Sequence, residues 1–466
     1  MPEPFDLVIT GASAVTGRAV FPATIAVRDG RIAGVLAPQE RPAAREQVEA
    51  RGLHLLPGVI DTHVHTRHPG NPDREDMISG TEAAAAGGVA TILEMPISKI
   101  PVSSAAALRR RVEAMQPGAL VDFGLYGGAG EENVAEVSEL AAAGALAFKT
   151  FLQPPPLHRA DEFTGMWCTD PAALRDVVAA VAATGLRHAF HCENGPLLTA
   201  LQQRLEEKGR KDGLAHAESR PPIVEESSVA LVLALGEEAR AAVHVVHLSS
   251  PRAARLVRDA RARGVEVTTE TCPHYLLLTT EALADHAGFA KCNPPLRSRE
   301  DVEALWACVT SGDVDVLGSD HSPFLAEEKA KGAENVFLAP PGLCGLELLL
   351  PLMLTAVAEG RLGLPLVVRL LAERAAEVFR LPGKGRLEPG ADADLTLVDL
   401  RAAWTYDHHK ARTRSRESMR VWDGFRLKGR VVSTYVRGTR VFHEGEITAR
   451  PGHGRFVRPL PKQANA

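Results

Sequence analysis

Short apolar runs alternate along the middle of this chain with stretches whose apolar positions recur every three or four residues. In one such unit, the apolar run 243–248 is followed by Ser250-Pro251 and then by an i, i+3, i+4, i+7 apolar spacing over 253–260. Serine before proline is a favourable helix start, and this spacing is that of an amphipathic helix. The pattern predicts a strand, a helix and then a second strand over 265–270.

The same order of elements recurs elsewhere in the chain. A helix is predicted from Asp170-Pro171 to Gly185, and it leads into an apolar strand over 187–190. Repeated strand–helix units over about residues 57–381 are the pattern of a parallel sheet. Their number favours an α/β fold of the (β/α)8 TIM-barrel type over an open doubly wound sheet. No glycine-rich or Walker phosphate-binding motif follows a predicted strand, which argues against nucleotide binding.

Both ends of the chain are predicted to form strands instead. Near the N-terminus, two apolar runs flank Asp29-Gly30, a strong signal for a two-residue hairpin. Near the C-terminus, runs over 431–436 and 440–443 flank Arg437-Gly438 in the same way. We therefore expect one small β domain assembled from residues 1–56 and 382–466, with the barrel over 57–381 between them. The tail after Arg450 is expected to be extended and peripheral.

Composition excludes several classes of protein. A length of 466 residues excludes one small domain, and a net charge of −5 with 5% aromatic residues argues against nucleic-acid binding. None of the six cysteines forms a C-x-x-C pair, so neither a disulfide scaffold nor a thiolate zinc site is expected. No secretory signal is visible, and the apolar stretch 343–357 is short and interrupted by Glu347. We expect a cytoplasmic protein without a membrane partner.

Potential metal ligands stand at the ends of five apolar runs. They are His63 with His65, Lys149, His191, His247 and Asp320. A barrel gathers the carboxyl ends of its strands around one site, so these side chains are expected to converge there. His63 and His65 are two residues apart and therefore lie on the same face of one strand. The combination predicts a metal site.

Each of these residues also has a simpler interpretation when taken singly. A lone histidine at a strand end is more often a hydrogen-bonded structural residue, Lys149 could form a salt bridge, and Asp320 could belong to an ordinary loop. Five strand ends of matching chemistry make coincidence a poor explanation. The remaining histidines are expected at the surface or in packing. His244, for instance, is three residues before His247 and should face the opposite side of its strand.

Longer motifs also occur along the chain. They are PGVIDTHVH (57–65), GTEAAAAGG (80–88), EMP (94–96), FK (148–149), HCEN (191–194), VHLSS (246–250), ETCPHY (270–275), PPLR (294–297), SDHSP (319–323) and GRLEPGADAD (385–394). Together they resemble the motifs of the cyclic amidohydrolases of the amidohydrolase superfamily. The similarity covers nearly the whole chain. It implies a (β/α)8 barrel with a small β-sandwich made from both termini.

The resemblance also implies a binuclear metal site. In such a site His63, His65 and Asp320 hold one ion and His191 and His247 hold the other. Lys149, carboxylated by carbon dioxide, would bridge the two. Zinc is the expected metal, with manganese or iron left open. A metal-bridging hydroxide would open the ring of a cyclic amide while Asp320 carries the proton to the leaving nitrogen.

The motifs divide between subfamilies that act on different rings. The longest blocks match allantoinases, which hydrolyse allantoin to allantoate. Arg67 resembles the carboxylate-binding arginine of dihydroorotases, although Ile97 departs from their usual asparagine. Hydantoinases and dihydropyrimidinases carry a tyrosine where this chain has Pro154. Allantoinase is the preferred interpretation, and dihydroorotase or another hydantoinase-like or dihydropyrimidinase-like amidase stays open.

Further expectations concern substrate contacts and assembly. By resemblance, Asn293 and the loop containing Gly342 and Cys344 touch the amide edge of the ring, and Arg67 is either a substrate contact or part of an ion pair. Specificity is expected from Arg67, Ile97, loop 153–158 and segment 325–339, the last of which forms either a mobile lid or a solvated helix. Relatives are commonly homotetramers. Some are non-enzymatic scaffolds that have lost metal ligands, but all six ligand positions are intact here.

Overall fold

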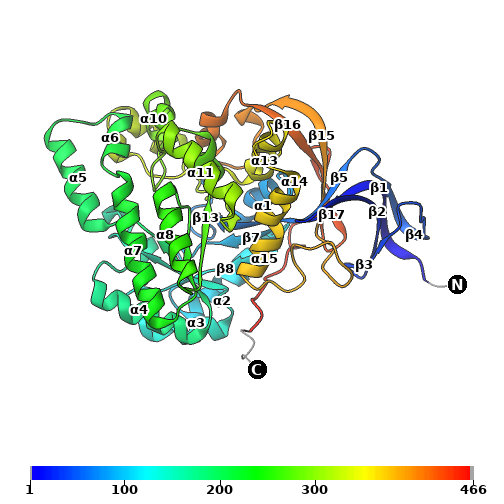
Figure 1. The fold of residues 1–466 in the computed structure, drawn as a ribbon, viewed down its shortest axis with the longest axis horizontal. Coiled ribbons are helices and arrows are strands. Elements are labelled where there is room, and N and C mark those ends of the chain that lie inside the picture. The colour runs from blue at the N-terminus through cyan, green and yellow to red at the C-terminus, as the bar shows by residue number, and fades with distance from the viewer. Residues whose placement is uncertain (1–2, 462–466) are drawn as a thin grey trace.

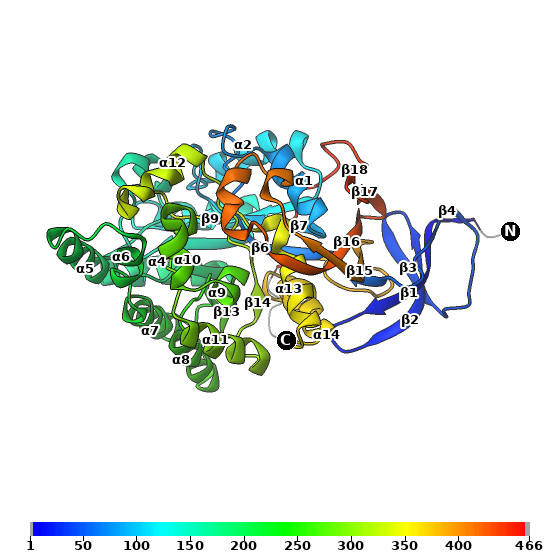
Figure 2. The same ribbon diagram turned by 90° about the horizontal axis from the view of Figure 1, so that it is seen from above.

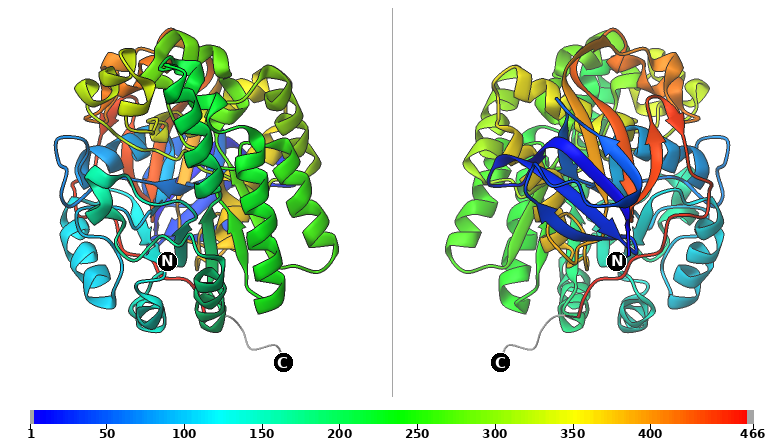
Figure 3. Two further views of the ribbon diagram at one scale, coloured as in Figure 1. Left: turned by 90° about the vertical axis from the view of Figure 1, so that its left-hand side faces the viewer. Right: turned by 90° about the vertical axis from the view of Figure 1, so that its right-hand side faces the viewer.

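The computed structural model describes residues 3–461, except for the side chains of Leu157 and His158. Its larger part is a barrel of parallel strands surrounded by helices, and a sheet built from both chain ends lies at one side (Figures 1 and 2). Figure 3 shows the N-terminal strands, in blue, beside the C-terminal strands, in orange and red, at that end of the molecule. The predicted barrel with a β domain from both termini is confirmed.

Eight successive strand positions build the barrel. The strands are β6 (Val59–Val64), β7 (Val89–Glu94), β8 (Asp122–Leu125) with β9 (Gly127–Gly128), β10 (Ala147–Phe151), β11 (Arg187–His191), β12 (Val243–Val245), β13 (Val267–Thr271) and β14 (Val316–Leu317). Neighbours in this order pair in parallel, and only Tyr126 separates β8 from β9. A parallel bridge between Val64 and His321 joins the end of β6 to the segment after β14, which closes the ring.

Helices cover the outside of the barrel and form most of the connections between its strands. They are α1 (Met77–Ala86), α2 (Ala105–Met115), α3 (Val137–Ala143), α4 (Pro171–Thr184), α5 (Gly195–Glu207), α6 (Gly213–Glu218), α7 (Pro222–Ala239), α8 (Pro251–Ala262), α9 (Pro273–Leu277), α10 (Thr280–His286), α11 (Arg299–Ser311), α12 (Ala326–Ala330), α13 (Leu349–Ala358), α14 (Leu364–Val368) and α15 (Arg374–Val378). The predicted helix starts are confirmed, because Asp170 and Ser250 cap α4 and α8 with their side chains. Each cap satisfies main-chain N–H groups that the first helical turn leaves free.

The strands of the two termini form one continuous sheet. They are β1 (Phe5–Val15), β2 (Val20–Arg28), β3 (Arg31–Leu36), β4 (Ala44–Glu49), β5 (His54–Pro57), β15 (Leu395–Thr405), β16 (Arg426–Val436), β17 (Thr439–His443) and β18 (Glu446–Ile447). The order is β18-β17-β16-β15-β5-β1-β2-β3, with β4 beside β1. Leu7, Leu55, Leu395 and Tyr435 belong to one apolar core, so residues from both ends bury each other. The predicted limit at 56/57 falls at the end of β5.

The tail after Arg450 is mostly exposed or half-buried, and it pairs with a barrel strand, which the sequence did not predict. The main chain of residues 455–457 pairs with Phe123 of β8, and the rings of Phe123 and Phe456 lie 5.7 Å apart. Gly454 packs so closely that an added Cβ would come within 2.0 Å of the Val121 carbonyl oxygen. The tail therefore adds main-chain hydrogen bonds to an edge of the barrel sheet that would otherwise lack them.

Apolar side chains fill the lower part of the barrel interior. Ile60, Leu93, Ala147 and Ala189, from four different strands, belong to one buried cluster that also includes Val246, directly after β12. Since side chains alternate along a strand, the next inward positions on β10 and β11 are Lys149 and His191. The apolar cluster thus supports the polar side chains that lie above it, at the carboxyl ends of the strands.

Candidate active site

The six predicted metal ligands all line one cavity at the carboxyl ends of the barrel strands. Each of them is buried. β6 carries His63, with His65 just beyond its end, while β10 and β11 carry Lys149 and His191. His247 and Asp320 follow β12 and β14. The convergence expected from strand-end placement is therefore what the fold produces.

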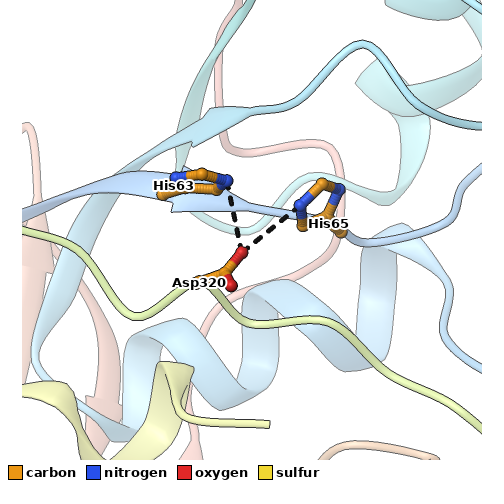
Figure 4. Close-up of side chains that lie close together, drawn as sticks. All are labelled: His63, His65 and Asp320. Atoms are coloured by element: carbon orange, nitrogen blue, oxygen red, sulfur yellow. Dashed lines mark ion pairs between the residues drawn. The ribbon is translucent and has the colours of Figure 1, made fainter. Parts of the chain in front are cut away.

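His63, His65 and Asp320 form the first half of this cluster. The Asp320 Oδ1 atom lies 3.2 Å from His63 Nε2 and 3.5 Å from His65 Nε2 (Figure 4). These atoms are close enough to bind one ion together. Hydrogen bonds fix the two segments against each other, because His65 N–H donates to the His321 carbonyl and Ser319 N–H to Asp61 Oδ1.

His191 and His247 form the second half. His191 Nε2 lies 2.8 Å from Glu193 Oε2, an arrangement that places the ring proton on Nε2. His191 Nδ1 is then left with a lone pair, and it lies 2.8 Å from His247 Nε2. Two imidazole nitrogens that face each other so closely are well placed to share a cation.

Lys149 lies in the same cavity with its amine unsatisfied. Its side chain is fully buried, and Nζ has no hydrogen-bond partner in the structure. Burial lowers the pKa of this amine and raises that of the Asp320 carboxyl. An unpartnered buried amine is costly, so the position indicates a chemical role and not a structural one.

The donors present fit divalent metal ions. Burial lowers the pKa of all four imidazoles, that of His63 to about 4, so each ring is neutral near pH 7 and can offer a lone pair. Neutral imidazoles together with a carboxylate suit zinc and related metals. The facing lone pairs of His191 and His247 are also a feature that a bound cation would resolve.

Glu270, at the end of β13, supports the cluster from behind. Its Oε1 lies 2.8 Å from His63 Nδ1 and accepts the His247 N–H at 3.2 Å, and Thr62 donates to Oε2. Burial alone would raise the pKa of this carboxyl, but His63 and His244 hold it below its ordinary value. Sequence reasoning assigned no role to Glu270, although an acidic residue at the end of an apolar strand was a usable signal.

The expectation that His244 and His247 face opposite sides of β12 is wrong. His244 is buried, its Nε2 lies 4.0 Å from Glu270 Oε2 and its ring packs on Phe379 of the barrel interior. The strict alternation of a strand breaks at His247, whose φ is 38°. Both side chains therefore lie inside the barrel, where the His244 ring approaches Glu270 and the His247 ring lines the cavity.

Three of the four predicted substrate contacts line the cavity, namely Arg67, Asn293 and Gly342. Asn293 Oδ1 is buried without a partner, and a Cβ at Gly342 would meet the Ser322 Oγ at 2.7 Å. Cys344 is buried and does not line the cavity. Gly342, two residues earlier, is the part of this loop that faces the site.

Arg67 is a buried guanidinium that is only partly satisfied. Its Nη2 donates to Ser322 Oγ at 2.6 Å, while Nε and Nη1 have no partner. The group lies over the Phe324 ring, and burial together with Arg159 lowers its pKa to about 9. Two free donors at the wall of the cavity suit an anionic or carbonyl oxygen of a ligand.

The remaining wall comes from the predicted specificity positions and a few apolar neighbours. Gln153 and Pro154 of the loop after β10 line the cavity together with Ile97, Phe151 and Phe163. Gln153 Nε2 lies 3.2 Å from His191 Nε2. The side chains of Leu157 and His158, at the end of the predicted loop, lie outside the described residues.

Fold and site together define a (β/α)8 barrel enzyme with a candidate metal centre. The model of the amidohydrolase family matches residues 54–441. An allantoinase of Rubrobacter xylanophilus is 39% identical over 98% of this chain and 98% of its own length. A dihydroorotase of Methanothermobacter thermautotrophicus is 37% identical over 93% of each chain. The solved L-hydantoinase of Arthrobacter aurescens superposes with a TM-score of 0.93 at 33% identity, covering 97% of this chain and 100% of that one.

This chain therefore belongs to the amidohydrolase family. It is an enzyme of the cyclic amidohydrolase type that its relatives represent. In the part of the chain that the structure describes, no helix combines the length and the apolar character needed to cross a bilayer.

Proposed function

We propose that this chain is a metal-dependent allantoinase, which hydrolyses allantoin to allantoate. The observation that carries the proposal is the convergence of His63, His65, Lys149, His191, His247 and Asp320 in one cavity. Allantoin as the ring is supported by several relatives named allantoinase, which are 33% to 39% identical over nearly the whole chain.

The proposed site would hold two metal ions, with zinc expected. His63, His65 and Asp320 would hold one, His191 and His247 the other, and Lys149 would bridge them as a carbamate. A free ammonium cannot ligate a metal, whereas a carbamate offers two anionic oxygens. When bound, the metals would lower the pKa of a water molecule and polarise the substrate carbonyl.

The chain's own residues orient the ring and move the proton. Asn293 and the main chain at Gly342 would bind the amide edge of the ring, while Ile97 and Phe163 shield it from water. A carboxylate oxygen of Asp320 would accept the proton of the attacking water and return it to the departing ring nitrogen. Glu270 would keep the His63 ring in the orientation that turns Nε2 toward the cavity.

Dihydroorotate is a second candidate because of Arg67. The two free donors of this buried guanidinium would find a partner in a ring carboxylate, which allantoin does not carry. Allantoin offers instead the carbonyl oxygen of its exocyclic urea, a neutral acceptor. The two candidates therefore differ in the charge of the group that Arg67 contacts.

Parallel assays of ring opening with allantoin, dihydroorotate and hydantoin test the proposal. We expect the highest kcat/KM with allantoin. Clear turnover of another ring without turnover of allantoin would overturn the choice of substrate but leave the class of reaction intact. No turnover of any cyclic amide by the metal-loaded protein would overturn the proposed function itself.

A further inference from the structure

The segment that follows Asp320 carries one completely buried lysine in an otherwise exposed or half-buried short helix. It contains α12 and a short turn over Val336–Leu338, and it leads to Pro341 and Gly342 in the wall of the cavity. Lys329, in the middle of α12, is completely buried. A buried lysine in so short a helix requires a partner for each of its hydrogens.

Lys329 finds these partners in the main chain. Its Nζ donates to the carbonyl oxygens of Gly342 at 2.7 Å, Lys291 at 3.0 Å and Pro340 at 3.1 Å. An ammonium group has three hydrogens, so this set uses its whole donor capacity. Two of the three acceptors belong to the loop at the cavity wall, and the third is two residues before Asn293.

Lys291 makes a similar set of hydrogen bonds, from its own segment to the main chain that follows Lys329. Its Nζ donates to the carbonyl oxygens of Ala339 at 2.6 Å, Val336 at 2.8 Å and Phe337 at 3.3 Å. In the part of the chain that the structure describes, every acceptor of these two ammonium groups is a main-chain carbonyl. The two lysines thus satisfy an irregular stretch of main chain that has no sheet or helix partner of its own.

The main chains of the two segments also touch directly. A Cβ on Gly288 would lie 2.1 Å from the Lys329 carbonyl oxygen, and one on Gly332 would lie 2.4 Å from the Gly288 Cα. Gly342 N–H donates to the Lys291 carbonyl at 2.9 Å. The Lys329 ammonium therefore lies at a close joint between residues 288–293 and 329–342.

We propose that Lys329 is a positioning residue for substrate recognition. It holds the main chain at Gly342 and before Asn293 in the geometry that meets the amide edge of the ring. This role rests on the proposed function, since it assumes that a ring binds at these groups. Lys329 is not among the residues that line the cavity, so its effect on the substrate passes through the loop.

The test compares Lys329→Met with Lys331→Met, an exposed lysine of the same segment. Methionine keeps the length and apolar stem of the side chain but donates no hydrogen bond. With the ring that the wild type opens, we expect KM to rise about tenfold or more in Lys329→Met, kcat to change less than about threefold, and metal content to stay constant. Lys331→Met should match the wild type.

Hydrogen exchange gives a second readout that needs no activity. The amides of residues 336–342 should exchange faster in Lys329→Met than in the wild type or in Lys331→Met. If Lys329→Met does not fold, Lys329→Gln, which keeps two N–H donors, carries the same comparison with a smaller rise in KM.

The possible failures are distinguishable. A folded Lys329 variant with unchanged KM and unchanged exchange overturns the positioning role. A fall in kcat together with loss of metal also overturns it, because Lys329 would then act through the metal site. A wild type that opens no cyclic amide is instead a failure of the proposed function, and exchange alone then decides the role of Lys329.

Discussion

Lys149 is the residue whose environment is hardest to explain without chemistry. Its amine is fully buried and has no hydrogen-bond partner, whereas the other buried lysines Lys291, Lys329 and Lys384 each reach three oxygen acceptors. A carbamate at Lys149 would turn this unsatisfied amine into an anionic group among the imidazoles. The proposed bridging role therefore accounts for a feature that simple packing does not.

Replacing Lys149 tests that role. We expect Lys149→Ala to lose activity by about a hundredfold or more, since removal of even an outer partner of a metal site costs 10- to 100-fold. Acetate or propionate should restore part of the rate by supplying a carboxylate in the space left behind. Activity assays and metal analysis of the variant, with and without the acid, measure both effects. Unchanged activity in Lys149→Ala would refute the bridging role.

Arg67 bears on the charge of the substrate. Arg67→Met should lower kcat/KM for a ring that carries a carboxylate by about a hundredfold, because a buried charge contact is worth several kcal/mol. For neutral allantoin the loss should stay below about tenfold. Steady-state assays with both rings measure the difference.

Arg74→Met is a matched control, because Arg74 also lies over Phe324 but pairs with Glu328. Equal losses of kcat/KM for the two rings would mean that Arg67 does not distinguish a charged substrate from a neutral one.

At the scale of elements, one carboxylate joins three strands of the barrel. Glu270 at the end of β13 contacts Thr62 and His63 of β6 and the main chain of His247 beyond β12. The ligands of both proposed metal positions thus depend on a single side chain that lies behind them. Glu270 therefore acts on the proposed ligands through its contacts with His63 and with the main chain of His247.

Glu270→Gln is expected to weaken metal binding while preserving the fold. The amide keeps the size of the carboxylate but loses the charge that orients the His63 ring, which typically costs 10- to 100-fold in metal affinity or activity. Titration with a competing chelator measures the affinity. Asp170→Ala provides a comparison, because it removes a helix cap at about 1 kcal/mol of stability and Asp170 does not line the cavity. Wild-type metal affinity in Glu270→Gln would contradict the assigned role.

At the scale of the whole molecule, a buried ion cluster joins the barrel to the terminal sheet. Lys384 Nζ lies 2.5 Å from Asp122 of β8, 2.7 Å from Asp394 and 3.0 Å from Asp392, both just before β15. Arg437, in the turn between β16 and β17, also pairs with Asp122. The cluster therefore ties β8 to the segment before β15 and to the turn between β16 and β17.

Lys384→Met should destabilise the protein by about 3–5 kcal/mol, because it leaves buried carboxylates without their cation. Denaturant unfolding followed by circular dichroism measures the free energy. Arg386→Met is the matched control, since Arg386 pairs with Glu388 at the surface and such pairs contribute at most about 1 kcal/mol. A Lys384 variant as stable as the control would show that the cluster does not hold the two parts together.

Sequence patterns were sufficient for the fold and for the residues of the central cluster. Apolar periodicity is set locally, so strands, helices and the caps at Asp170 and Ser250 are visible in it. The barrel then carries strand-end residues such as Lys149 and Asp320 into one cavity without further information. At these residues, the apolar runs in the sequence are enough to predict the place of the side chain in the fold.

Features that depend on contacts between distant parts of the chain could not be predicted from the sequence. His247 faces the same side as His244 because of the positive φ at His247, and the docking of the tail depends on Phe123, more than three hundred residues earlier. Lys291 and Lys329 lie in irregular segments whose acceptors are main-chain carbonyls, which leave no trace in residue type. Gly342 and Cys344 were both expected at the substrate, but only Gly342 lines the cavity.

We propose that six side chains at the barrel's strand ends hold a pair of metal ions that serve hydrolysis of a cyclic amide. Metal analysis of the purified, active protein by mass spectrometry tests it most directly. We predict about two equivalents of divalent metal per chain, with zinc as the main element. An active protein that contains no metal, or only one ion after reconstitution with excess zinc, would contradict the claim.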